Sequence, residues 1–263
     1  MTLQDLLALA SGGLVGFALG LIGGGGSILA VPLLLYVVGV RDPHVAIGTS
    51  ALAVSLNAFA NLAQHARAGT VKWGCAATFA VAGVAGAFVG STLGKLMNGE
   101  RLLALFALVM IAVGVSMLRS RRADGDADVR MNLKMAPRLV SVGLGAGALS
   151  GFFGIGGGFL IVPGLVFSTG MPILNAVGSS LLSVGTFGLT TAANYAVSGL
   201  VDWKLAALFI LGGVAGGLVG MRLAVRLAKE RSALVRVFAG VLFAVAAYML
   251  YRSVGPMFAG ASG

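Results

Sequence analysis

The sequence predicts an all-α polytopic membrane protein with two inverted structural repeats, each a glycine-broken helical hairpin followed by three transmembrane helices. Of the 263 residues, 58% are hydrophobic and only 10% are charged, which is more apolar surface than a soluble domain of this size could bury. Several apolar runs reach the ~20 residues needed to cross a bilayer. In addition, one set of motifs occurs twice along the chain.

The duplication is visible as four pairs of matching segments that keep the same order. They are GLIGGGGSILAVP (20–32) and GFFGIGGGFLIVP (151–163), IGTSAL (47–52) and VGSSLL (177–182), AGTVKW (68–73) and SGLVDW (198–203), and GVAGAFVG (83–90) and GVAGGLVG (213–220). Because the spacing between the pairs hardly changes, we interpret the two halves as copies of one unit.

Each half contains a row of apolar segments that predicts five helical pieces. The pieces cover 3–21, 27–39, 45–66, 72–96 and 101–119 in the first half, and 139–153, 158–169, 173–197, 203–221 and 233–252 in the second. The expected organisation is repeat 1 over 1–119, a cytoplasmic linker over 120–137, repeat 2 over 138–253 and a C-terminal tail over 254–263. The polar and charged composition of the linker is typical of a solvated joint.

The orientation of the halves depends on the second apolar piece of each, which at ~13 residues is too short to span a bilayer alone. If this piece completes a broken span, the halves are parallel. If it forms a hairpin that returns to the same side, the halves are inverted, and more of the Lys and Arg residues then face the side of the linker. The positive-inside tendency therefore favours inversion. We attribute the net charge of +10 to the same tendency rather than to a nucleic-acid partner.

Glycine clusters interrupt the most hydrophobic segment of each half. Irregular backbone survives at membrane depth only inside protein or beside a water-filled cavity, and broken helices recur at transport sites. A break would direct the N–H groups and the positive dipole end of the following half-helix toward an anion. We therefore expect substrate-binding residues at Gly24, Gly25, Gly26 and Ser27, and at Gly156, Gly157 and Gly158. The alternative is that these glycines only permit close helix packing, the role we assign to the glycines of 83–90 and 213–220.

Polar side chains follow one face of the third apolar piece in each half. They are Ser50, Asn57, Asn61 and Gln64 in the first half, and Ser180, Ser183, Thr190 or Thr191, and Asn194 in the second. Such residues either line a pathway or join helices through hydrogen bonds. Our candidate substrate ligands among them are Ser50, Asn57, Asn61, Ser180 and Thr191.

The acidic residues all fall near predicted helix ends or in loops. This distribution argues against a central acidic proton relay and against a carboxylate cation site, and it favours a small oxyanion bound by neutral groups. His44 and His65 lie at predicted helix ends, where they either couple transport to protons or are simply interfacial. We find no motif typical of an enzyme, a cofactor site or a metal site.

The paired GxxGxGG…VP segments, each followed by G-[TS]-S and later by a G-x-V-x-W turn, resemble the sulfite exporter family (TauE/SafE). The resemblance implies a duplicated transporter of the cell membrane that moves sulfite, an organosulfonate or a related small sulfur oxyanion. The expected function is thus a secondary transporter with alternating access and a midplane site made by helix N-termini. Two alternatives stay open: a passive anion channel with the same site, and a membrane scaffold that transports nothing. Homo-oligomer formation is also open.

Overall fold

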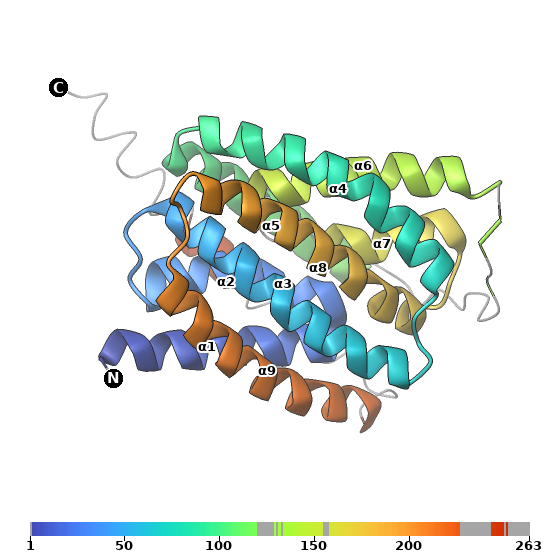
Figure 1. Cartoon of the computed structure of the whole chain (residues 1–263), viewed down its shortest axis with the longest axis horizontal. Coiled ribbons are helices and arrows are strands. Elements are labelled where there is room, and N and C mark those ends of the chain that lie inside the picture. Colours follow the sequence, from blue (N-terminus) through green and yellow to red (C-terminus); the bar gives the residue numbers. More distant parts are fainter. Residues whose placement is uncertain are drawn as a thin grey trace.

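The computed structural model describes residues 2–119, 129, 131–132, 134–154, 158–226, 243–249 and 251 (Figure 1). Most of the predicted linker, all of the predicted tail and part of the predicted last helix lie outside these residues. The described residues are helical apart from short turns and contain no strand, which confirms the all-α class. Within the described part of the chain, five helices are long and apolar enough to cross a membrane, namely those beginning at Leu3, Pro43, Trp73, Ile173 and Trp203.

The helices follow the predicted pieces closely. Repeat 1 contains α1 (Leu3–Ile22), the 3-10 segment η1 (Gly23–Leu29), the single turn α2 (Ala30–Pro32), the π-helical segment η2 (Leu33–Val37), α3 (Pro43–Arg67), α4 (Trp73–Leu96) and α5 (Gly99–Arg119). Repeat 2 contains α6 (Ala136–Phe153), α7 (Gly158–Thr169), α8 (Ile173–Val197) and α9 (Trp203–Arg226).

The largest departure from expectation is the piece predicted over 27–39, which is not one regular helix. The chain forms a 3-10 segment, a single α-helical turn and a π-helical segment in succession. Two local causes account for this irregularity. The glycines of η1 have little preference for the α-helix, and Pro32 has no N–H group to donate to the helical ladder.

The ends of the helices are set by local chemistry, and the two repeats share the glycines that end their helices but not the side-chain cap of α3. Asp42 caps α3 by accepting a hydrogen bond from the His44 N–H at 2.7 Å, and Pro43 occupies the first helical position. Glycines with positive φ end several of the helical segments. The six in the described chain form three pairs at equivalent positions of the two repeats: Gly23 and Gly154, Gly39 and Gly170, and Gly69 and Gly199. Both repeats therefore turn at the same places.

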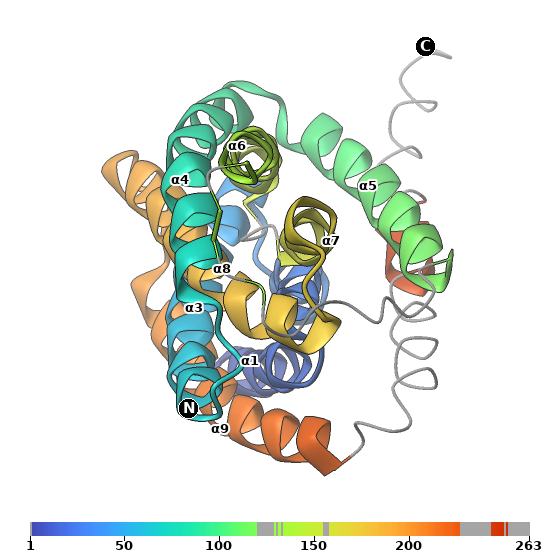
Figure 2. The same cartoon turned by 90° about the vertical axis from the view of Figure 1, so that its right-hand side faces the viewer.

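Each repeat contributes a helix to a pair with the other repeat. α1 packs in parallel along α9, and a methyl group on Gly16 would overlap the backbone of Gly213. α6 packs along α4 in the same way, with Gly147 against Gly83. Figure 2 shows α4 beside α6 on one side of the bundle and α1 beside α9 on the other. Contacts of this kind, in which backbones meet directly, need small residues on both helices.

The equivalent helices α3 and α8 cross between these pairs and run antiparallel to each other. The Ser55 hydroxyl donates to the carbonyl oxygen of Gly185 at 2.6 Å, and Gly48, near the start of α3, faces Tyr195, near the end of α8. Residue numbers therefore rise along α3 while they fall along the facing stretch of α8. This arrangement supports the inverted orientation of the repeats, which stays a prediction.

Two hydrogen bonds join the repeats at equivalent positions. The Thr49 hydroxyl accepts from the Asp202 N–H at 2.9 Å, and the Ser179 hydroxyl accepts from the Lys72 N–H, also at 2.9 Å. Asp202 and Lys72 directly precede α9 and α4, where main-chain N–H groups have no partner within the helix. A hydroxyl on each central helix thus completes the start of a helix in the opposite repeat.

Candidate functional site

The first glycine segment interrupts the regular α-helix inside the bundle. α1 ends at Gly23, whose φ of 76° is unfavourable for other residues, and whose N–H donates to the Leu19 carbonyl. The seven residues that follow as η1, from Gly23 to Leu29, are all buried and include the candidates Gly24, Gly25, Gly26 and Ser27. The interruption expected from the glycine run is therefore present, and it is enclosed by protein.

The second glycine segment begins with the same kind of break. α6 ends at Phe153, and Gly154 follows in the left-handed conformation with a φ of 67°. The candidates Gly156 and Gly157 lie outside the described residues, whereas Gly158 is buried and begins α7.

The two glycine segments meet. A methyl group on Gly158 would overlap the backbone of Gly24, so these main chains touch without a side chain between them. Each corner also rests on the central helix of the opposite repeat, Gly23 on Val177 and Gly154 on Ile47. The structure thus places Gly24 of repeat 1 against Gly158 of repeat 2, inside the bundle.

The serine candidates already donate their hydroxyl protons. Ser27 donates to the Gly24 carbonyl at 2.8 Å, Ser50 donates to Ile47 at 2.9 Å and Ser180 donates to Val177 at 2.7 Å. A hydroxyl that donates to its own helix presents only lone pairs to its surroundings. In this conformation these three side chains therefore offer no proton to an anion.

The two asparagines of α3 have polar atoms without partners. Asn57 is 0% exposed, and neither its amide nitrogen nor its oxygen has a hydrogen bond. Asn61 is 1% exposed; its nitrogen donates to the Asn57 main-chain carbonyl at 2.9 Å, while its oxygen has no partner. A buried polar group without a partner costs about 1–3 kcal/mol. The pair is thus a place where a ligand or water would gain hydrogen bonds.

The contacts of these amides lie on α1 and α9. A methyl group on Gly213 would overlap the Asn57 amide, and one on Gly217 would lie 2.8 Å from the Asn61 nitrogen. Gly20 of α1 faces the Asn61 oxygen, which would lie 3.2 Å from a methyl group added to Gly20. Gly20 lies just before η1, so Asn61 contacts α1 near the first glycine corner.

On α8 the buried polar groups without partners are hydroxyls. The Thr191 hydroxyl is buried and has no partner, as expected of a candidate ligand. The Ser183 hydroxyl and the Tyr195 hydroxyl are also buried without partners. Ser183 belongs to the polar stripe of the sequence, but Tyr195 was not singled out, because a lone tyrosine in an apolar helix has no distinguishing spacing.

Lys95 is a second residue that the sequence analysis did not select. Its ammonium group donates to the carbonyl oxygen and the side-chain oxygen of Asn194 and to the Ser198 hydroxyl, at 2.8–2.9 Å. These partners lie at the C-terminal end of α8, where a cation is favourable for the helix dipole. Lys95 therefore fastens α4 to the opposite repeat, and all three partners are neutral oxygens.

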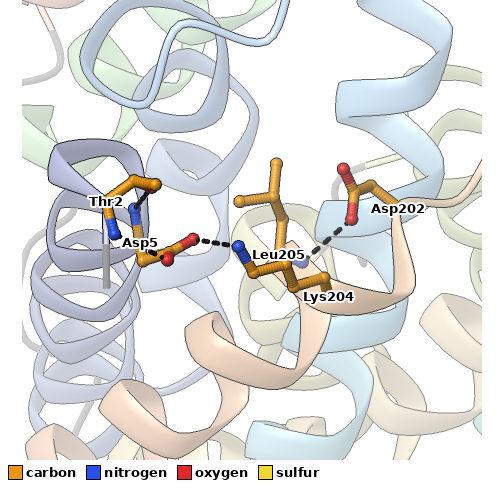
Figure 3. Close-up of polar contacts among 5 residues, drawn as sticks. All are labelled: Thr2, Asp5, Asp202, Lys204 and Leu205. Carbon is orange, nitrogen blue, oxygen red and sulfur yellow. Dashed lines mark hydrogen bonds and ion pairs between the residues drawn. The ribbon is translucent and has the colours of Figure 1, made fainter.

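An ion pair joins the N-terminal ends of α1 and α9 (Figure 3). Asp5 Oδ1 lies 2.7 Å from Lys204 Nζ, and the Asp5 carboxylate also accepts from the Thr2 N–H. Beside it, Asp202 accepts from the Leu205 N–H at 3.0 Å. These carboxylates serve the ends of helices and lie apart from the asparagines, which occupy the middle of α3.

These features define a multi-pass helical membrane protein with a buried, neutral polar set between interlocked helices. The chain belongs to the family described as "Sulfite exporter TauE/SafE", which matches residues 8–249.

The relatives of the chain carry transporter names. The chain is 57% identical over 255 residues to a "Probable membrane transporter protein" of Xylella fastidiosa (strain 9a5c), covering 96% of this chain and 98% of the relative. It is 30% identical over 202 residues to "Probable membrane transporter protein MJ0441" of Methanocaldococcus jannaschii, covering 73% and 71%. It is 25% identical over 255 residues to "Probable membrane transporter protein YunE" of Bacillus subtilis (strain 168), covering 89% and 93%. No solved structure matches the chain.

Proposed function

We propose that the protein is a secondary transporter of a small sulfur oxyanion, sulfite or an organosulfonate, that works by alternating access. The observation that carries this proposal is the contact between the two glycine segments, with Gly24 of one against Gly158 of the other inside the bundle. Broken helices that meet within the membrane are typical of transport sites. The family description supports a sulfur oxyanion as the substrate.

In this mechanism the anion is bound by neutral groups. The main-chain N–H groups at the start of α7, from Gly158 on, together with the positive end of its dipole, would attract the negative charge, whereas the N–H groups of 25–29 lie within the 3-10 segment η1 and would first have to leave their partners there. The Asn57 nitrogen and the Thr191 hydroxyl, which have no partners, add hydrogen-bond donors. Ser50 and Ser180 would have to release their helix carbonyls before donating to the anion.

Alternating access would follow from an inverted orientation of the two repeats. The α1–α9 pair and the α4–α6 pair each hold together by close backbone contact, so we expect each to move as one body. The antiparallel α3 and α8 lie between them. Rocking of the pairs against this centre would open the site first on one side of the membrane and then on the other. Those residues of the site that the structure describes are buried, as in a closed state of such a cycle.

Flux of sulfite into proteoliposomes tests the proposal. We expect Gly25→Val and Gly157→Val to reduce the rate at least ~tenfold, because a β-branched side chain keeps an anion away from the main-chain N–H groups. Gly145→Val is the matched control, since a side chain there would face open space. All variants must first elute as single, monodisperse species. Unchanged flux through both variants would contradict the proposed site.

The two alternatives make different predictions. A passive channel would give single-channel currents and a flux that ignores the proton gradient. A scaffold would show no stabilisation of the purified protein by sulfite, sulfate, taurine or sulfoacetate, whereas a transporter is stabilised by its substrate in proportion to its affinity.

A further inference from the structure

The unpartnered atoms of Asn57 and Asn61 are unequal in kind. Two carbonyl oxygens and one amide nitrogen have no hydrogen bond, while the second nitrogen is occupied by the Asn57 main-chain carbonyl. This count does not depend on how the amides are oriented. Both ends of the Asn57 amide are without partners, and a turned Asn61 amide would place its oxygen against a carbonyl oxygen. The pair therefore offers more acceptors than donors.

An excess of acceptors is unfavourable for a plain oxyanion. Sulfate, a sulfite dianion or a simple alkylsulfonate presents only acceptor oxygens, which would satisfy the Asn57 nitrogen and repel the two carbonyl oxygens. A sulfur oxyanion that also carries a hydroxyl, an ammonium group or an acidic proton can donate to these oxygens. Only the second kind of ligand satisfies the whole set.

The neighbours of the two asparagine amides supply no side-chain hydrogen-bond partner. Glycines 213 and 217 of α9 and Gly20 of α1 place bare main chain beside the two amides. At the equivalent place in repeat 2, Phe187 lies against Gly83 and stacks with Phe79 at a ring distance of 6.4 Å. The two sides of the pseudo-symmetric centre therefore differ, with unpartnered amides over a glycine on one side and a stacked aromatic ring over a glycine on the other.

We propose that Asn57 and Asn61 select, among small sulfur oxyanions, those that carry a hydrogen-bond donor beside the anionic group. This inference rests on the proposed function and specifies the substrate class of the same site. The first glycine corner, which follows Gly20 on α1, would hold the anionic end, and the two amide oxygens would accept from the donor. A site with buried acceptors rejects an analogue that lacks the donor, because those acceptors are left unpaired.

The test uses two sulfonates of the same charge, isethionate with a hydroxyl group and ethanesulfonate without one. For the full chain in detergent, we expect the half-stabilising concentration in thermal unfolding to be at least ~tenfold lower for isethionate. In Asn57→Leu and Asn61→Leu this ratio should fall to near one. Asn175→Leu is the control, because its amide donates to the Thr70 carbonyl at a helix end and lies outside the site. Its ratio should match that of the native chain.

The outcomes separate the inference from the proposed function. If both sulfonates stabilise the native chain equally, or if the ratio survives in both asparagine variants, the donor selection is wrong while the transporter stands. If neither sulfonate nor sulfite stabilises the protein or crosses the membrane with it, the proposed function itself is wrong. Where a leucine variant fails to fold, competition of the two sulfonates against sulfite flux in the native chain gives the same ratio.

Discussion

The two central helices, α3 and α8, have the same packing environment but differ in the side chain that faces the neighbouring helix. On α3, Asn57 lies against Gly213 of α9, and on α8 the equivalent Phe187 lies against Gly83 of α4. The glycine beneath, the neighbouring helix pair and the hydroxyl that joins the repeats are matched on the two sides. One side nevertheless holds a buried amide without partners, and the other holds a stacked aromatic ring.

The difference shows which parts of the duplicated unit can vary. Close backbone packing tolerates no added atom, so both copies retain it. The side chain that fills the space above the glycine is free to change, and there the copies have become polar and apolar. We therefore expect substitutions at the glycine contacts between helices to have equal effects in the two repeats. Substitutions of the side chain that packs on the glycine should have unequal effects.

The largest effect should come from the glycine contacts between paired helices. Gly16→Leu and Gly147→Leu occupy equivalent positions, and each would force a side chain into the backbone of the opposite repeat. Overpacking at such a contact costs about 1–3 kcal/mol or more, and here no flexible side chain can yield. We expect neither variant to yield monodisperse protein on size-exclusion chromatography.

Gly145→Leu is the control for these variants. It faces open space, and repeat 1 carries a half-exposed leucine, Leu14, at the equivalent position. This variant should purify like the native chain. Normal yields of only one of Gly16→Leu and Gly147→Leu would show that the two helix–helix contacts are not equivalent.

The next largest effect concerns the side chains that pack on these glycines, Asn57 and Phe187. Asn57→Phe gives repeat 1 the residue that repeat 2 already accommodates over a glycine, so the fold should persist while the polar ligand is lost. We expect sulfite flux in proteoliposomes to fall at least ~tenfold. Phe187→Leu should keep the flux and lose about 1 kcal/mol of stability through the smaller core side chain. Equal losses of flux in both variants would remove the functional difference between the two sides.

A smaller effect is expected from the hydroxyls that join the repeats. Thr49→Val and Ser179→Ala each remove the acceptor for one N–H group at the start of a helix. Each should lower the free energy of unfolding in mixed micelles by about 1 kcal/mol. The double variant should show the sum, because the two bonds lie at separate helix starts. A much larger effect on one side would break the equivalence.

The smallest effect is expected at the ion pair between Asp5 and Lys204, which has no counterpart between α4 and α6 in the described part of the chain. Lys204 is largely exposed, so Lys204→Gln should shift the unfolding midpoint less than either hydroxyl variant does. The shift should disappear in high salt, where exposed charges are screened. A shift that persists in salt would mean that the lysine stabilises the α1–α9 pair through packing.

The main helices could be predicted because their signals are local. The piece expected over 45–66 is observed as Pro43–Arg67, where an Asp42 cap, a proline and a closing Gly69 lie within the segment and its neighbours. The packing role predicted for the glycines of 83–90 is also observed, with Gly86 and Gly90 against the backbone of α6.

The irregular segment and the state of the polar groups could not be predicted. Periodicity places Asn57 and Ser50 on one face, but it does not reveal that Ser50 donates to its own helix while Asn57 rests on Gly213, far along the chain. Partner choice between helices is decided by tertiary packing. For the same reason, the sequence did not reveal that Lys95 would cap α8.

The pairing of helices across the repeats has a consequence for biogenesis. Among helices α1 to α9, α1 is synthesised before all the others, whereas its parallel partner α9 begins only at Trp203 and is synthesised last. During synthesis the glycine face of α1 must therefore wait in lipid or against a temporary neighbour such as an insertase. A protein truncated before Trp203 would leave this face uncovered and become a substrate for membrane quality control.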